Sequence, residues 1–154
     1  MRNQPTLIIR KNIRARSKQW FLKRLKHLKI ILANLIKGKK NNLIKNASVT
    51  IIITNNKEIK KLNLKFRKKD KATDVLSFQL KIKEQIRQKY LGDIIISSQY
   101  AKKNALSKKV TFDNEMMLLI VHGYLHLLGY DHIVPKEAKT MFKLQNRIMK
   151  EIEK

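Results

Sequence analysis

The stretch Val121–His132, V-H-G-Y-L-H-L-L-G-Y-D-H, decides how this chain is organised. His122 and His126 are four residues apart, so on a helix they project from the same face. The preceding run is apolar and free of proline, and Gly129 follows the last leucine, where a left-handed residue commonly ends a helix. A turn at that glycine can direct His132 back toward the other two imidazoles.

Three of the four histidines of the chain would then converge on one point. Imidazole is a common zinc ligand, and three protein ligands leave a fourth position open for water or substrate, as in catalytic zinc sites. We therefore predict that His122, His126 and His132 bind one Zn²⁺ ion. Imidazole also suits iron, nickel and copper, so the spacing leaves the identity of the metal open. The remaining histidine, His27, lies among lysines and is interpreted as an exposed residue.

Length and composition predict one folded domain that spans residues 1–154, because 43% of the chain is hydrophobic. The lack of cysteine excludes disulfides, thiolate metal sites and a cysteine nucleophile. We find neither a signal sequence nor an apolar run of about 18 residues. These features favour a cytoplasmic protein without a membrane partner.

The formal charge of +25 comes from 36 lysines and arginines against 11 acidic residues. Such a surface attracts polyanions, and RNA or DNA is the first candidate. The abundance of lysine, isoleucine and asparagine also indicates a compositional bias that would account for part of this charge. The charge therefore supports a nucleic-acid partner without proving one.

The periodicity of apolar residues predicts a mixed α/β fold, in which helices pack on a roughly four-stranded mixed sheet. Strands are expected at Thr6–Lys11, Ala47–Thr54, Thr73–Leu80 and Tyr90–Ser97. Helices are expected from Ser17 to about Gly38, over residues 57–66, 98–109 and 114–128, and from Pro135 onward. The polar stretches 37–45 and 81–89 are expected to be loops. Among the residues expected to face inward are Phe66 and Leu106.

Three motifs in order resemble the YbeY family, the bacterial rRNA maturation factors with single-strand endoribonuclease activity. The histidine segment from His122 to His132 is similar to the signature of that family. The segment Leu62–Phe78, L-N-L-K-F-R-K-K-D-K-A-T-D-V-L-S-F, and the L-G-D-I of Leu91–Ile94 resemble two others. The likeness covers roughly residues 45–150. Ala72 and Gln79 stand where prolines are usual, Phe66 where tyrosine is, and Gln145 where glutamate is frequent.

This resemblance implies a single-strand-specific, zinc-dependent endoribonuclease that acts in 16S rRNA 3′-end maturation and ribosome quality control. It implies rRNA as substrate and a ribosomal partner. It also implies that Arg67 is a functional arginine in a cleft facing the metal. Arginine suits the charge that develops on a phosphoryl group in its transition state. Without the resemblance, Arg67 would be one cation among 36.

Two alternatives share these features. The spacing H-x-x-x-H-x-x-G-x-x-H also occurs in metzincin peptidases, but Gly123 stands where those enzymes carry the glutamate general base. The other alternative is a non-catalytic, zinc-stabilised factor that binds rRNA during ribosome assembly. Asp131 could either orient an imidazole or cap the turn after Gly129. The sequence leaves the cleavage site, the general base and the oligomeric state open.

Overall fold

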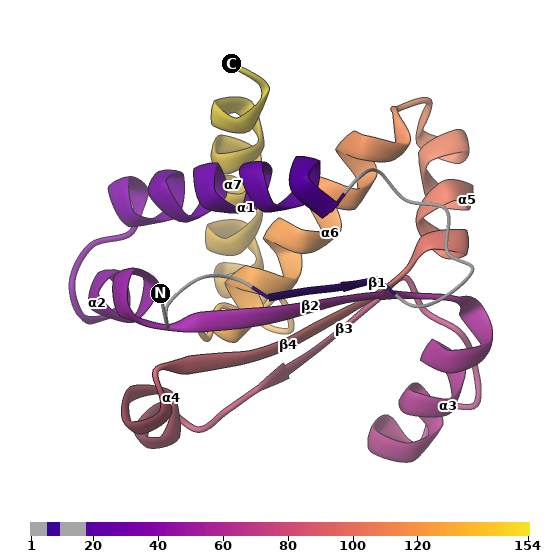
Figure 1. The fold of residues 1–154 in the computed structure, drawn as a ribbon, viewed down its shortest axis with the longest axis horizontal. Helices are drawn as coiled ribbons and strands as arrows, with labels where there is room; N and C mark the ends of the chain where they lie inside the picture. Colours follow the sequence, from indigo (N-terminus) through magenta and orange to yellow (C-terminus); the bar gives the residue numbers. More distant parts are fainter. Residues whose placement is uncertain (1–5, 10–17) are drawn as a thin grey trace.

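The computed structural model describes residues 6–9 and 18–154. One mixed sheet contains the strands of this part of the chain, β1 (Thr6–Ile9), β2 (Ser48–Thr54), β3 (Val75–Gln79) and β4 (Tyr90–Ser97), in the order β1-β2-β4-β3 (Figure 1). β2 is parallel to both β1 and β4, whereas the edge strand β3 is antiparallel to β4. The mixed α/β class is therefore confirmed. Arg10, Lys11 and Ser17, which fall in the predicted first strand and first helix, lie outside the described residues.

Helices pack on both faces of this sheet (Figure 1). Those in the described residues are α1 (Lys18–Leu35), α2 (Lys39–Asn46), α3 (Asn56–Arg67), α4 (Ile82–Gln88), α5 (Ser98–Lys108), α6 (Phe112–Leu127) and α7 (Pro135–Glu153). The main core lies between the sheet and α1, α2, α6 and α7. A smaller cluster under α3 contains Ile59, Leu76 and Ile95. In the described residues, no helix combines the length and apolar character needed to cross a membrane.

The alternation of side chains along the strands separates these two clusters. In β2, Ile51 and Ile53 belong to the main core, whereas Ile52 packs against the cluster under α3. In β4, Ile94 and Ile96 likewise face the main core, and Ile95 faces the other way. Successive residues of a strand point to opposite faces. Helix α3 and helix α6 therefore cover opposite faces of the sheet.

A bulge in β4 interrupts this alternation at Gly92. Ser48 pairs with Tyr90 and Thr50 with Asp93, so β4 advances by one residue more than β2. The φ of Gly92 is 139°, which side chains rarely allow, and a Cβ there would overlap the carbonyl oxygen of Phe78 on β3. A glycine is thus required where the backbones of β3 and β4 come close.

The predicted loops at 37–45 and 81–89 are wrong, because they contain α2 and α4. Both helices are short and mainly polar. Helix α2 buries only Leu43 and Ile44, and α4 buries only Gln85. A helix of two turns offers too few inward positions to produce an apolar period in the sequence. Gln85 instead anchors α4 through hydrogen bonds from its Nε2 to the carbonyl oxygens of Leu91 (3.0 Å) and Leu127 (2.8 Å).

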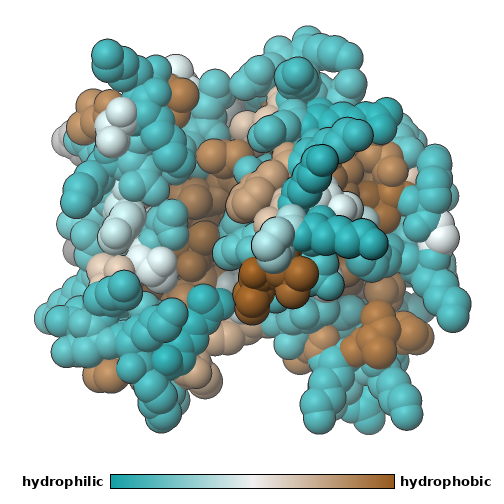
Figure 2. All heavy atoms as spheres, turned by 180° about the vertical axis from the view of Figure 1, so that it is seen from behind, coloured by the Kyte–Doolittle hydropathy of each residue, from teal (hydrophilic) through white to brown (hydrophobic). Residues whose placement is uncertain are grey.

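Two residues expected to face inward are exposed. The exposed fraction is 55% for Phe66 and 73% for Leu106. Phe66 packs edge-on against Phe78 of β3, with ring centroids 5.1 Å apart, so it covers the rim of the sheet. Much of the surface seen from behind is hydrophilic, with separate apolar patches (Figure 2). Periodicity identifies the apolar stripe of a helix. It does not show which residues of that stripe extend beyond the packed neighbour and stay exposed.

Replacing Gly92 by alanine should destabilise the protein by about 3–6 kcal/mol, because the new Cβ adds overlap with Phe78 to an unfavourable φ. The measurement is the free energy of unfolding from urea titrations. Gly38→Ala is the matched control: its φ is +75° and nothing lies within 4 Å of the built Cβ. That substitution should cost only about 1–3 kcal/mol, from the unfavourable φ alone. Equal losses in the two variants would contradict a close contact between β3 and β4.

Candidate metal centre

Helix α6 presents two of the three histidines. Thr111 caps its start, because the hydroxyl oxygen accepts a hydrogen bond from the Asn114 N–H at 3.1 Å. At Gly123 the helix lies against the sheet: a Cβ there would be 2.7 Å from Ile94 Cγ2. With about 100° between successive residues, His122 and His126 project about 60–100° around the helix from Gly123. Both imidazoles therefore lie beside the contact between helix and sheet, half-buried.

The turn after α6 directs the third histidine back. Gly129 adopts the expected left-handed conformation, with φ of 81°. Its N–H donates to the carbonyl oxygen of His126 at 2.9 Å, so the helix ends here. The Asp131 carboxylate accepts a hydrogen bond from the backbone N–H of His132 at 2.7 Å. Of the two roles considered for Asp131, the geometry supports the cap of the turn.

The three imidazoles face one another. Their candidate ligand atoms all lie within 4.8 Å of one another, and Nε2 of His122 is 3.1 Å from Nε2 of His126. Two nitrogens bound to a tetrahedral zinc ion at about 2.0–2.1 Å lie about 3.3 Å apart. His132 is exposed, so one side of the group is open to solvent. The donor set and its spacing fit a metal ion with an accessible position.

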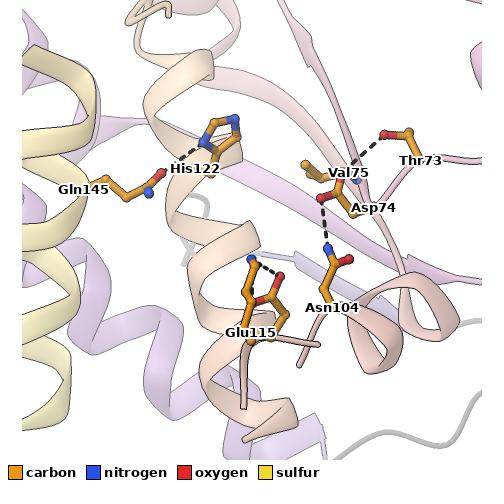
Figure 3. Close-up of polar contacts among 8 residues, drawn as sticks. Thr73, Asp74, Val75, Asn104, Glu115, His122 and Gln145 are labelled. Atoms are coloured by element: carbon orange, nitrogen blue, oxygen red, sulfur yellow. Dashed lines mark hydrogen bonds and ion pairs between the residues drawn. The ribbon is translucent and has the colours of Figure 1, made fainter. Parts of the chain in front are cut away.

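Gln145 of α7 supports this group and was given no role by the sequence. Its Oε1 lies 2.9 Å from Nδ1 of His122 (Figure 3). A carbonyl oxygen can only accept, so Nδ1 carries the proton and Nε2 keeps its lone pair for a ligand. Gln145 is 8% exposed, which leaves its amide little freedom. A buried polar residue in the apolar stripe of α7 was the signal that could have identified it.

The electrostatic setting favours neutral imidazoles. Burial lowers the pKa of His122, and the nearby His132 lowers it further, while the hydrogen bond to Gln145 and the charge of Asp74 act in the opposite direction. Burial also lowers the pKa of His126, with contributions from His122 and His132. A metal binds the neutral form of imidazole. At neutral pH these two side chains are therefore in the form that binds.

Two further carboxylates, Asp74 and Glu115, have protein partners (Figure 3). Asp74, at the start of β3, accepts hydrogen bonds from the Val75 N–H at 2.8 Å and from the side-chain amide of Asn104 at 3.3 Å. Glu115 of α6 is buried and paired with Lys108 of α5, at 2.8 Å. Both carboxylates stabilise the junctions between elements around α6.

Arg67 is the last residue of α3 and is exposed. In the part of the chain that the structure describes, its side chain makes no hydrogen bond or ion pair. Its helix covers the face of the sheet opposite α6 and reaches the rim formed by β3 through the contact between Phe66 and Phe78. The structure does not place Arg67 in contact with the histidines, so its role stays a prediction.

These features define a class: a strongly basic mixed α/β protein with three converging histidines, open to solvent on one side, that could hold a metal ion. Comparison with known proteins narrows this class. The family model described as Endoribonuclease YbeY matches residues 12–153. The chain belongs to the YbeY endoribonuclease family, which supports a role as an RNA endonuclease.

Individual relatives agree. The chain is 45% identical to Endoribonuclease YbeY of Persephonella marina over 111 residues, which are 71% of this chain and 72% of that protein. It is 41% identical to Endoribonuclease YbeY of Pelagibacter ubique over 132 residues, which are 83% and 86% of the two chains. A solution structure of a Thermotoga maritima protein superimposes with a TM-score of 0.62 at 30% identity, and covers 97% of this chain and 89% of that one.

Replacing Gln145 by leucine should lower zinc affinity about tenfold to a hundredfold, because His122 loses the acceptor that holds its Nδ1 proton. Gln145→Glu keeps an acceptor and should keep the affinity. Asn146→Leu, at the next position of α7 and exposed, is the control. Competition with a chromophoric chelator gives the three affinities. If the leucine variant binds zinc as tightly as the parent protein, Gln145 does not support the site.

Proposed function

We propose that this protein is a zinc-dependent endoribonuclease that cleaves single-stranded RNA. Its place would be the cytoplasm, where it would act in 16S rRNA 3′-end maturation and in ribosome quality control, with the ribosome as partner. The observation that carries the proposal is the convergence of three imidazoles at an open position in a member of this family. The formal charge of +25 adds affinity for RNA phosphates.

In this proposal His122, His126 and His132 hold the zinc ion. When bound there, zinc would supply Lewis-acid chemistry, which makes water more acidic and polarises a phosphoryl oxygen. Gln145 would keep the lone pair of His122 Nε2 free for a metal ion, because it accepts the Nδ1 proton in a hydrogen bond. The exposed side of His132 lets an RNA phosphate approach from solvent. The chain thus supplies orientation and access.

Arg67 would bind the phosphate that is attacked, or one next to it. Guanidinium offers paired N–H donors that match phosphate oxygens, and these contacts strengthen as charge develops. The absence of a protein partner among the described residues leaves the group available for RNA. Exposed lysines at positions 65, 68, 69 and 71 surround it with further positive charge. The family resemblance assigns the role, and the exposure of Arg67 agrees with it.

The two alternatives differ in support. The spacing of a metzincin peptidase needs a glutamate at position 123, but a glutamate side chain would meet Ile94 and Ser77 there. The alternative of a non-catalytic rRNA-binding factor is supported only by the positive charge of the chain. Such a factor would bind RNA with steep salt dependence and show no metal-dependent cleavage.

His126→Ala should abolish zinc binding and lower the rate of RNA cleavage by at least about a hundredfold, while RNA affinity persists through phosphate contacts. His27→Ala is the matched control, because His27 is exposed on α1 and outside the group. Elemental analysis and cleavage of single-stranded rRNA fragments, with and without chelator, are the measurements. The assignment as a zinc-dependent nuclease would be contradicted if cleavage persisted both with chelator and in His126→Ala. It would also be contradicted if the parent protein did not cleave RNA.

Arg67→Ala should lower kcat about a hundredfold to a thousandfold with unchanged zinc content, since the arginine would act on charge that develops in the transition state. Arg67→Lys should recover only part of this loss, because an ammonium cannot make the paired contact. Lys69→Ala, an exposed cation two positions away, controls for general loss of charge. If Arg67→Ala changed only KM, and by as much as Lys69→Ala, Arg67 would contribute general positive charge and no specific contact in the transition state.

A further inference from the structure

An aromatic ring stands at the edge of the histidine group without being buried by the fold. Phe142 lies on α7 and is 41% exposed, whereas Met141 beside it is fully buried. Its ring is nearly parallel to that of His132, with an interplanar angle of 20° and centroids 5.7 Å apart. Relative to His122 the angle is 24° and the distance 6.5 Å. Phe142 thus forms an aromatic wall of the candidate metal centre.

The two residues that follow His132 in the chain are also apolar and exposed. Ile133 and Val134, which connect His132 to α7, are 82% and 50% exposed. Apolar groups are unusual neighbours for a site that handles phosphates in a chain of net charge +25. Phosphate contacts would need cations or amides at this position. Apolar and aromatic groups there indicate that a second, apolar part of the substrate rests beside the metal.

We propose that Phe142 is a positioning residue on which one unpaired nucleobase of the RNA stacks, next to the phosphodiester that is cleaved. The inference rests on the proposed function, which supplies the RNA. Base and phosphate of one nucleotide are joined through a single ribose, so a base on Phe142 keeps its phosphate within reach of the histidine group. Stacking on an aromatic side chain contributes about 1–3 kcal/mol per base and tolerates any base.

This contact would make the site selective for single strands. Lysines and arginines bind the phosphates of single and double strands alike. A ring face accepts only a base whose own face is free, and in a duplex both faces are covered by neighbouring pairs. Phe142 therefore distinguishes the two forms of RNA, which the histidines and the charge cannot do.

A purely structural role of Phe142 would change different measurements than base stacking would. If Phe142 only holds His132 in place, its loss weakens zinc binding and lowers cleavage of every substrate. If it stacks a base, zinc binding persists and only the affinity for single strands falls. Zinc content and strand preference therefore separate the two roles.

The experiment uses the full-length, zinc-loaded protein and a short fluorescein-labelled 2′-O-methyl RNA, alone and annealed to its complement. Phe142→Leu, which keeps apolar bulk without the aromatic face, should weaken binding of the single strand about 5- to 150-fold. Its duplex affinity and its zinc content should equal those of the parent protein. Phe142→Trp should restore single-strand binding. Leu106→Ala, an exposed apolar residue on α5, is the control and should change nothing.

Unchanged single-strand affinity in Phe142→Leu, an equal loss for single strand and duplex, or loss of zinc would each overturn the inference. The readout is binding, so it does not depend on cleavage. A parent protein that never cleaves RNA, yet loses strand preference in Phe142→Leu, would refute the nuclease function and keep the stacking site. A parent protein that cleaves, with strand preference untouched by Phe142→Leu, would do the reverse.

Discussion

The close contact of α6 with the sheet at Gly123 is the constraint on which the candidate site depends. The missing side chain lets the helix approach until Ile94 and Ser77 would touch a Cβ at that position. This contact sets the rotation of α6, and so directs His122 and His126 to the flank of the sheet rather than into the core. The same glycine removes the glutamate that a peptidase of this spacing needs. Gly123 therefore determines both how α6 packs on the sheet and which general base the motif lacks.

Helix α7 supplies residues that surround the histidines of α6. Met141 and Ile148 lie in the main core with α6, and this packing brings the intervening face of α7 to the histidines. From that face Gln145 holds the proton on His122, and Phe142 lies parallel to the ring of His132. One helix therefore supplies both a polar support for the metal ligands and an apolar surface beside them. The histidines themselves come from α6 and the turn that follows it.

The sequence predicts the parts of this arrangement that local periodicity determines. His122 and His126 on α6, the left-handed Gly129 and the returning His132 all fall within eleven residues, so their spacing alone indicates the group. The contact between His122 and Gln145 joins residues 23 apart and depends on how two helices cross. Helices α2 and α4 bury one or two side chains each, too few for a pattern. Arg67 is indicated only by resemblance, because one cation among 36 carries no pattern of its own.

Affinity for RNA and choice of RNA arise from different physical sources here. A charge of +25 attracts any polyanion at long range, and a three-histidine metal centre can engage any accessible phosphodiester. Neither the charge nor the metal centre distinguishes a paired base from an unpaired one. Selectivity must therefore come from groups that contact base faces, and such groups are aromatic, exposed and close to the reacting phosphate. Within the described residues, Phe142 meets these three conditions through its 41% exposure and its stacking beside His132.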